Sequence, residues 1–169
     1  MKSVRWIMDS VPPPAYRLLM GWPEDIRVDR WLISEFRAPS VVRLFTGAAP
    51  GAGQGQGFGF TDLMAELPSG GLGLRNINCI TPETATTAHY FWANPYHTPE
   101  ISDERTAKMF AQIMKAFEQD WAVLELQQAN WDDRPVINVN ADAPFLAARQ
   151  LLDRRIAEEA QQLKAAAAE

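Results

Sequence analysis

Short apolar runs separated by turn-forming residues characterise the first hundred positions of the chain. All ten glycines and most of the prolines lie in this part. Frequent glycine and proline between short apolar runs is typical of β-strands joined by turns. The predicted strands are, in chain order, residues 5–8, 28–36, 41–45, 72–80 and 84–92. The proline run at 12–14 ends the first of them, because proline cannot donate a hydrogen bond inside a sheet.

The hydrophobic period changes after residue 101. Apolar residues then recur every three or four positions, which predicts a helix from Ser102, a good N-cap, to about Trp131. The positions that carry this period are Phe110, Ile113, Met114, Phe117, Trp121 and Leu124. Residues 134–140 are then expected to form a short link or an edge strand.

A second helix is predicted after Asp142, with Pro144 in its first turn and apolar positions through Ile156. Its alanine-rich end, residues 161–169, has little to bury and is expected to fray. Strands followed by helices favour an α+β fold in which an antiparallel sheet grips long helices. We therefore expect one domain, residues 1–160, and a frayed tail.

Composition excludes several classes of function. Sixteen basic against twenty-one acidic residues give a net charge of −5, which argues against nucleic-acid binding. Cys79 is the one cysteine, so disulfides and multi-cysteine zinc or iron–sulfur sites within this chain are excluded. No apolar run reaches the roughly 18 residues of a membrane helix, and the start lacks the apolar stretch of a secretory signal. A cytoplasmic protein with no membrane contact is expected.

Two local patterns carry little chemistry. The glycine-rich stretch 47–59 lacks the Gly-Lys-Ser/Thr ending of a phosphate loop and the spacing of a dinucleotide motif, which favours a flexible hairpin loop. His89 and His97 have no metal-binding spacing. His89 lies in an aromatic strand and is expected to be a core or pocket residue, whereas His97 is expected in a loop.

Asp120 is an acid at an unusual place in the first predicted helix. It follows Phe117 by three positions and precedes Leu124 by four, so the helical period places it on the apolar stripe. A carboxylate there must be paired, protonated or metal-bound to offset its desolvation. Periodicity alone leaves open a structural salt bridge or a functional role. The candidate partners for a salt bridge are Arg149, Arg154 and Arg155 of the second helix.

Three stretches resemble one enzyme family: residues 81–93 (TPETATTAHYFWA), residues 117–128 (FEQDWAVLELQQ), and residues 5–14 (RWIMDSVPPP) taken with 28–31 (VDRW). They resemble the C-terminal catalytic region of Rieske non-haem iron oxygenases, in the branch of the vanillate O-demethylase oxygenases. The resemblance extends to about Glu159. It implies a helix-grip domain, in which a curved antiparallel sheet surrounds a long C-terminal helix.

The resemblance also implies a site. Complete members of the family bind Fe(II) through two histidines and one carboxylate, and the position of that carboxylate matches Asp120. His89, Phe91, Asn94 and Phe117 are the implied substrate-pocket residues. The parent reaction is an oxidation of an aromatic or methoxy-aromatic compound by O₂, with NAD(P)H electrons delivered by a reductase through a [2Fe–2S] Rieske cluster.

The chain departs from the family in its metal motifs. The C-x-H and C-x-x-H motifs of the cluster and the two-histidine iron motif are absent, so the cluster is not encoded here and no tightly bound iron is expected. The chain alone is expected to be inactive and to need a Rieske-domain-containing chain. A metal-free helix-grip module for a small hydrophobic ligand, or a structural subunit, remains the alternative. Surfaces covered in longer family members would be exposed, which favours a homo-oligomer.

Overall fold

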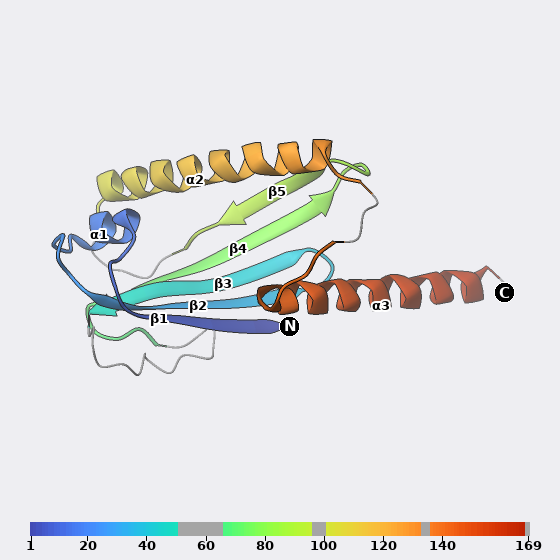
Figure 1. The fold of residues 1–169 in the computed structure, drawn as a ribbon, viewed down its shortest axis with the longest axis horizontal. Coiled ribbons are helices and arrows are strands. Elements are labelled where there is room, and N and C mark those ends of the chain that lie inside the picture. The colour runs from blue at the N-terminus through green and yellow to red at the C-terminus, as the bar shows by residue number, and fades with distance from the viewer. Residues whose placement is uncertain (51–65, 96–100, 133–135, 168–169) are drawn as a thin grey trace.

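The computed structural model describes residues 1–50, 66–95, 101–132 and 136–167. Its centre is a five-stranded antiparallel sheet in which the strands follow one another in chain order (Figure 1). The strands are β1 (Lys2–Ser10), β2 (Val28–Arg37), β3 (Val41–Pro50), β4 (Leu72–Pro82) and β5 (Ala88–Ala93). The helices are α1 (Pro14–Met20), α2 (Asp103–Ala129) and α3 (Ala143–Ala166), with a 3₁₀ turn η1 (Asn140–Asp142) before α3.

The predicted α+β fold is confirmed, and α2 lies across one face of the sheet as a helix-grip arrangement requires (Figure 1). The predicted N-cap is present, since the Ser102 hydroxyl accepts a hydrogen bond from the Arg105 N–H at 3.3 Å. The last strand begins at Ala88 rather than residue 84. The Thr84 hydroxyl accepts hydrogen bonds from the N–H groups of Thr86 and Thr87, and this turn competes with strand pairing.

Helix α1 is absent from the sequence-based prediction, which interpreted the proline run only as a strand end. Pro14 occupies the first turn, where its missing N–H costs nothing. Gly21 ends the helix in the left-handed conformation, with φ of 67°. Proline at the start and glycine just after the end are together the sequence signal for this seven-residue helix.

Each face of the sheet carries its own apolar cluster, because side chains alternate along a strand. Toward α2, the buried residues Leu72 and Leu74 of β4 pack with Leu19 of α1 and Met109 of α2. On the opposite face, Trp31, Ile33, Phe45 and Ala49 form a second cluster, with Leu67 packed against it. We call these the inner and outer faces.

Helix α2 is the longest element, and at about 1.5 Å per residue its 27 residues span about 40 Å. Its C-terminal half is exposed, with Trp121, Leu124 and Leu126 more than 60% accessible. The apolar stripe predicted for this helix is covered only around Met109, Ile113 and Phe117.

Helix α3 starts at Ala143 and extends beyond the end of the sheet (Figure 1). Asp142 precedes it as predicted, although its carboxylate accepts a hydrogen bond from the Val139 N–H of the preceding turn, at 2.9 Å. None of its described residues is buried, and it remains helical to Ala166, through the segment for which we expect fraying. Among the described helices, none is both long enough and apolar enough to cross a membrane.

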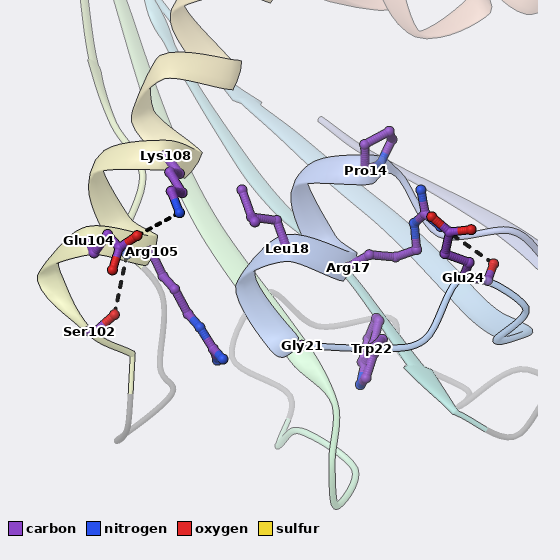
Figure 2. A pocket seen from close by; sticks show the side chains of 10 residues that line it. All are labelled: Pro14, Arg17, Leu18, Gly21, Trp22, Glu24, Ser102, Glu104, Arg105 and Lys108. Atoms are coloured by element: carbon purple, nitrogen blue, oxygen red, sulfur yellow. Dashed lines mark hydrogen bonds and ion pairs between the residues drawn. The ribbon is translucent and has the colours of Figure 1, made fainter.

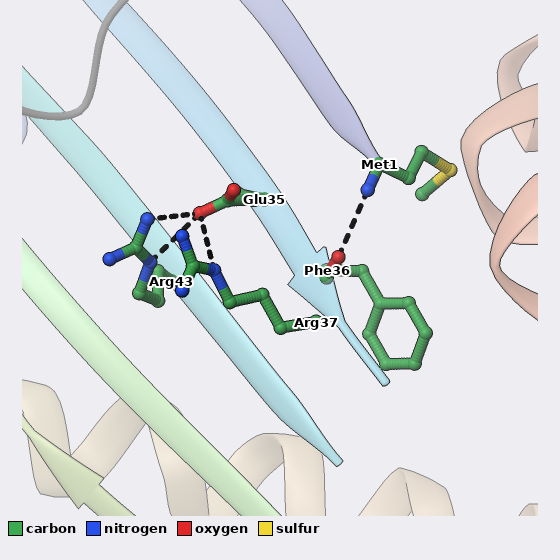
Figure 3. Close-up of polar contacts among 5 residues, drawn as sticks. All are labelled: Met1, Glu35, Phe36, Arg37 and Arg43. Atoms are coloured by element: carbon green, nitrogen blue, oxygen red, sulfur yellow. Dashed lines mark hydrogen bonds and ion pairs between the residues drawn. The ribbon is translucent and has the colours of Figure 1, made fainter. Parts of the chain in front are cut away.

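Polar contacts fix the pairing of the first three strands at one end of the sheet. The Glu35 carboxylate of β2 accepts hydrogen bonds from Arg43 Nε of β3, at 2.8 Å, and from Arg37 Nε, at 3.3 Å (Figure 3). The bond from Arg43 is the main cause that lowers the pKa of Glu35. The Met1 nitrogen donates to the Phe36 carbonyl oxygen at 3.0 Å, which ties β1 to the same end.

Candidate functional site

A cavity of about 280 Å³ lies between the inner face of the sheet and α2. That volume is at the small end of the range for small-molecule sites. Five elements and the segment after β5 build it. Its lining consists of Ala15 and Tyr16 from α1, Thr46 from β3, Leu74, Asn76 and Asn78 from β4, Trp92, Ala93 and Asn94 from β5 and the residue after it, and Met109, Ile113 and Phe117 from α2.

The register between β4 and β5 decides which side chains face this cavity. Asn78 pairs with Trp92 and Ile80 with Tyr90, so these residues share the inner face. Cys79 pairs with Phe91 and Thr81 with His89, and these four share the outer face. The even-numbered residues of β5 therefore point toward α2.

Aromatic rings form the wall of the cavity where β5 meets α2. The Trp92 ring stacks on Phe110 with centroids 5.6 Å apart and meets the edge of Phe117 at 5.0 Å. Tyr90 contacts Phe117 edge to face at 5.6 Å. Such pairs are favourable beyond the area they bury, and they give the cavity a flat wall suited to a planar ring.

Polar groups are set into this aromatic and aliphatic lining. The Tyr16 hydroxyl donates to Thr46 Oγ1 at 3.1 Å, and the Tyr90 hydroxyl donates to Asn78 Oδ1 at 2.7 Å. Asn76 Oδ1 and Asn94 Oδ1 are buried and have no hydrogen-bond partner in the described part of the chain. Two buried amide oxygens beside the cavity are therefore left without a hydrogen bond from the described part of the chain.

The two tyrosines at the cavity are un-ionised phenols at neutral pH. Burial raises the pKa of the Tyr16 hydroxyl, and the hydrogen bond to Thr46 and the charge of Arg30 only partly offset this. Burial also raises the pKa of Tyr90, and the nearby negative charge of Asp120 adds to the effect. Among the described lining residues, none carries a charge.

The raised pKa of Tyr16 predicts a loss of stability at alkaline pH. Above its ordinary pKa of 10.0 the unfolded tyrosine ionises while the buried one does not, so the free energy of unfolding falls as pH rises from about 10 toward the folded pKa. Tyr16→Phe removes the hydrogen bond to Thr46, so it should lower the free energy of unfolding by about 1 kcal/mol at pH 8. It also removes the ionisation, so the variant should be destabilised relative to the wild type by clearly less at pH 11. Urea unfolding at both pH values measures the two differences. If the difference in free energy of unfolding between the wild type and the variant is larger at pH 11 than at pH 8, Tyr16 is not buried in the folded protein.

Of the predicted pocket residues, the structure brings two to the cavity. Asn94 and Phe117 line it, from opposite walls. His89 and Phe91 lie on the outer face, where His89 Nε2 is 3.6 Å from a Glu83 carboxylate oxygen and the Phe91 side chain is exposed. His97 and most of the glycine-rich stretch, residues 51–59, lie outside the described residues.

Asp120 lies on α2 one turn beyond Phe117, on the side that faces β5. Its negative charge contributes to the raised pKa of the Tyr90 hydroxyl. The carboxylate therefore lies near Tyr90, at the edge of the aromatic wall. The residue is exposed, so it needs no partner to offset desolvation. The three candidate arginines make contacts within α3: Arg149 lies over the Phe145 ring, Arg154 donates to the Gln150 carbonyl, and Arg155 pairs with Glu158.

The described residues do not assemble an iron site. Nowhere in the ranges that the structure describes do three histidine, cysteine, aspartate or glutamate side chains come together. Asp120 is exposed on α2, while His89 is on the far face of the sheet. Two histidines and a carboxylate arranged on one face of a metal ion are therefore not provided by this part of the chain.

A second, wider hollow of about 530 Å³ lies where α1 meets the start of α2 (Figure 2). Its basic side chains already have protein partners. Arg105 donates to the Leu19 carbonyl at the end of α1 at 3.4 Å, Arg17 donates to the Glu24 carbonyl at 3.5 Å, and Lys108 pairs with Glu104 at 2.6 Å. Of these contacts, the one from Arg105 to Leu19 joins α2 to α1.

The polar cavity residues that sequence reasoning did not include are Tyr16, Thr46, Asn76 and Asn78. The signal for two of them was available as alternation, since positions 76 and 78 fall on the same face as Trp92 once β4 and β5 are paired. Tyr16 lies on α1, the helix that the strand interpretation of the N-terminal region did not include. Its position could be found only after that helix was recognised.

The fold and cavity define a class of protein: an α+β domain in which a long helix closes an aromatic-walled hollow on an antiparallel sheet. Comparison with known families makes this specific. Residues 1–158 match the vanillate O-demethylase oxygenase C-terminal domain, and the chain belongs to that family. No solved structure matches the chain.

Relatives with known names are oxygenase subunits. The chain is 32% identical over 161 residues to a vanillate O-demethylase oxygenase subunit of Pseudomonas sp., covering 92% of this chain and 46% of that protein. It is 31% identical over 132 residues to a toluene-4-sulfonate monooxygenase system iron–sulfur subunit of Comamonas testosteroni, covering 76% and 36%. It is 27% identical over 158 residues to the oxygenase component of a chloroacetanilide N-alkylformylase of Rhizorhabdus wittichii, covering 89% and 41%. The chain spans less than half the length of these relatives.

Proposed function

We propose that this chain forms the substrate-binding part of the catalytic domain of a Rieske-type aromatic oxygenase or O-demethylase. The observation that carries the proposal is the match of residues 1–158 to the C-terminal domain of the vanillate O-demethylase oxygenases. The complete assembly would oxidise an aromatic or methoxy-aromatic compound with O₂ and electrons from NAD(P)H. The names of the relatives mention vanillate, toluene-4-sulfonate and a chloroacetanilide, so they do not select one substrate.

The cavity supplies binding and orientation. Trp92 and Phe117 offer flat apolar surfaces on which a planar ring can stack, and the neighbouring amides can set its orientation by hydrogen bonding. Excluding water from a site lined in this way strengthens every polar contact inside it. The function proposed for these residues is therefore to hold the ring and fix which edge of it reaches the open side near Asp120.

Asp120 is proposed as the single iron ligand that this chain contributes to the complete assembly. Its place at the rim, next to the aromatic wall, is compatible with that role. One exposed carboxylate makes a weak and unselective metal site, so the isolated chain should not retain iron. The remaining ligands of Fe(II) and all ligands of the [2Fe–2S] cluster would come from another polypeptide chain.

Partner chains are proposed on the same basis. Relatives are named as subunits or components of oxygenase systems. The exposed apolar side chains Trp121, Leu124 and Leu126 of α2, together with Trp131 and Ile137, offer surface that a Rieske-domain-containing chain, or a second copy, would cover. A reductase would then act on the assembled oxygenase.

Metal analysis tests this proposal. The chain alone, the chain mixed with the N-terminal part of a vanillate O-demethylase oxygenase, and the same mixture with Asp120→Asn are each exposed to Fe(II), desalted and measured. We expect iron in the first mixture, with O₂ uptake on addition of NAD(P)H and reductase, and at least about tenfold less iron with the variant. Asp103→Asn, at the exposed start of α2, is the matched control and should retain the metal. A mixture free of iron and without O₂ uptake would refute the split-enzyme proposal.

A metal-free module for a small hydrophobic ligand is the second candidate. Two observations favour it. The described lining of the cavity has no charged residue, and the described residues contain no group of three metal-ligating side chains. In that case ligand binding would persist where the mixture experiment shows no iron.

A further inference from the structure

Three asparagine side chains gather on one wall of the cavity. Asn76 and Asn78 are two positions apart on β4, so they lie about 7 Å apart on the inner face. The Arg75 N–H donates to the Pro95 carbonyl oxygen at 2.9 Å, so the register of β4 and β5 continues past the last pair and places Asn94 opposite Asn76. Directly opposed residues of an antiparallel pair have Cβ atoms about 5 Å apart on the same face. The three amides therefore form one polar cluster.

The amides of Asn76 and Asn94 turn their oxygens away from the cavity. Each Oδ1 is closed off from solvent and has no hydrogen-bond partner in the described part of the chain. Both side chains line the cavity and are only half-buried, so the accessible end of each amide is its unbonded N–H₂ group. A buried N–H group without a partner is rarer in proteins than a buried carbonyl oxygen without one, which supports this orientation.

A hydrogen bond from Tyr90 fixes the amide of Asn78. The Tyr90 hydroxyl donates to Asn78 Oδ1 at 2.7 Å, and its ring packs edge to face on Phe117 at 5.6 Å. Because Tyr90 occupies the oxygen of Asn78, the N–H₂ group is the end of this amide that is left for a bound molecule. Tyr90 thus positions a residue of the cavity lining from the edge of the aromatic wall.

The three amides present donors, and the surroundings carry no positive charge to match an anion. A ligand oxygen with free lone pairs can accept from the N–H₂ groups, whereas a ligand group that only donates cannot. None of the described lining residues is charged, and Asp120 places a negative charge near Tyr90. An anion buried here would lose its hydration without gaining a cationic partner.

We propose that the cavity selects an uncharged aromatic compound whose ring carries an acceptor oxygen, as in an aldehyde, ketone or ester, and that Asn76, Asn78 and Asn94 supply the donors to it. Tyr90 is the positioning residue that sets the Asn78 amide. This rests on the proposed function of the cavity as the substrate site, and it names the class of substrate and the residues that select it. The aromatic wall holds any planar ring and does not contribute to this selectivity.

Calorimetry with three probes on the intact chain tests the selectivity. Methyl benzoate is neutral and has acceptor oxygens, propylbenzene has nearly the same shape and none, and benzoate is an anion. We expect methyl benzoate to bind about tenfold or more tightly than benzoate. Benzoate binding as tightly as methyl benzoate would overturn the proposal, as would the failure of methyl benzoate to bind.

Leucine variants assign the selectivity to the amides. Asn76→Leu and Asn94→Leu should each weaken methyl benzoate binding about three- to tenfold, the effect of one lost hydrogen bond. Propylbenzene binding should stay within about twofold, which also shows that the cavity is intact. Asn138→Leu, on an exposed asparagine outside the cavity, is the matched control and should change neither. Unchanged methyl benzoate binding in both cavity variants would overturn the proposal.

Tyr90→Phe tests the positioning role, because it keeps the ring against Phe117 and removes only the hydroxyl. We expect methyl benzoate to bind about threefold more weakly and propylbenzene to bind as before. In an Asn78→Leu background the same change should have no further effect, since the hydroxyl acts through that amide. An equal loss in both backgrounds would contradict the positioning role.

The mixture experiment separates this inference from the proposed function. Absence of iron and of O₂ uptake there, with the selectivity for methyl benzoate retained, would refute the oxygenase assembly and leave this inference standing. Iron and O₂ uptake in the mixture, with methyl benzoate binding insensitive to the asparagine variants, would refute this inference alone.

Discussion

Replacing Gly47 of β3 with alanine should destabilise the protein by about 3 kcal/mol or more, the upper range for overpacking a close-packed core. A Cβ at this position would lie well under 3.0 Å from the Leu72 carbonyl oxygen and from two atoms of the Trp31 ring. Trp31 is only 3% exposed and is packed against Phe45, so it has no free space to move into. The carbonyl belongs to the neighbouring strand, so relief of the clash requires β3 and β4 to separate.

Urea unfolding followed by circular dichroism measures this loss, and domains with 5–15 kcal/mol of total stability should show it clearly. Gly73→Ala is the matched control, because Gly73 pairs with Gly47 across the same two strands. A Cβ at Gly73 would lie 2.5 Å from the end of the flexible Leu67 side chain and 2.9 Å from the edge of the Phe45 ring. Neither contact is with backbone, so we expect a smaller cost of about 1–2 kcal/mol. Equal stability of the Gly47 variant and the wild type would show that Trp31 does not pack on β3 as described.

The strands and the two long helices could be predicted because each has a strong local signal. The alternation of apolar residues around Trp31 and Ile33 and the three- and four-residue spacing around Ile113 and Phe117 identify β2 and α2 without tertiary information. The end of β4 and the start of β5 could not be located in this way. There the threonines from 84 to 87 favour a strand by type, yet bond to one another in a turn.

The site was only partly predictable, because the aromatic run at 88–92 has bulky residues on both faces. His89 and Phe91 alternate as well as Tyr90 and Trp92 do, and local sequence cannot say which pair faces the helix. Pairing with β4 settles it, through a register with residues 8–14 positions away. For Asp120, the helical period gives the side of α2 on which it lies, but the period alone does not show that the residue is exposed.

Replacing Trp92 with alanine should weaken both the fold and ligand binding. Its ring joins β5 to α2 through Phe110 and Phe117, at centroid distances of 5.6 and 5.0 Å. Removal of a fully buried large aromatic side chain costs 3–5 kcal/mol; since Trp92 is half-buried, we expect a loss of about 2–3 kcal/mol. Loss of the stacking surface should weaken binding of a neutral planar aromatic probe such as methyl benzoate by about tenfold. Urea unfolding and probe titration measure the two effects.

Phe91→Ala is the control that makes this prediction specific to one face of β5. Phe91 is adjacent in sequence and similar in chemistry, but its side chain is on the outer face and 62% exposed. Its removal should change the free energy of unfolding by less than about 0.5 kcal/mol and leave probe binding unaltered. If instead the Phe91 variant loses binding and the Trp92 variant retains it, β5 presents its odd-numbered residues to the ligand. The cavity would then be rebuilt around His89 and Phe91, and Asn94 would face away from it.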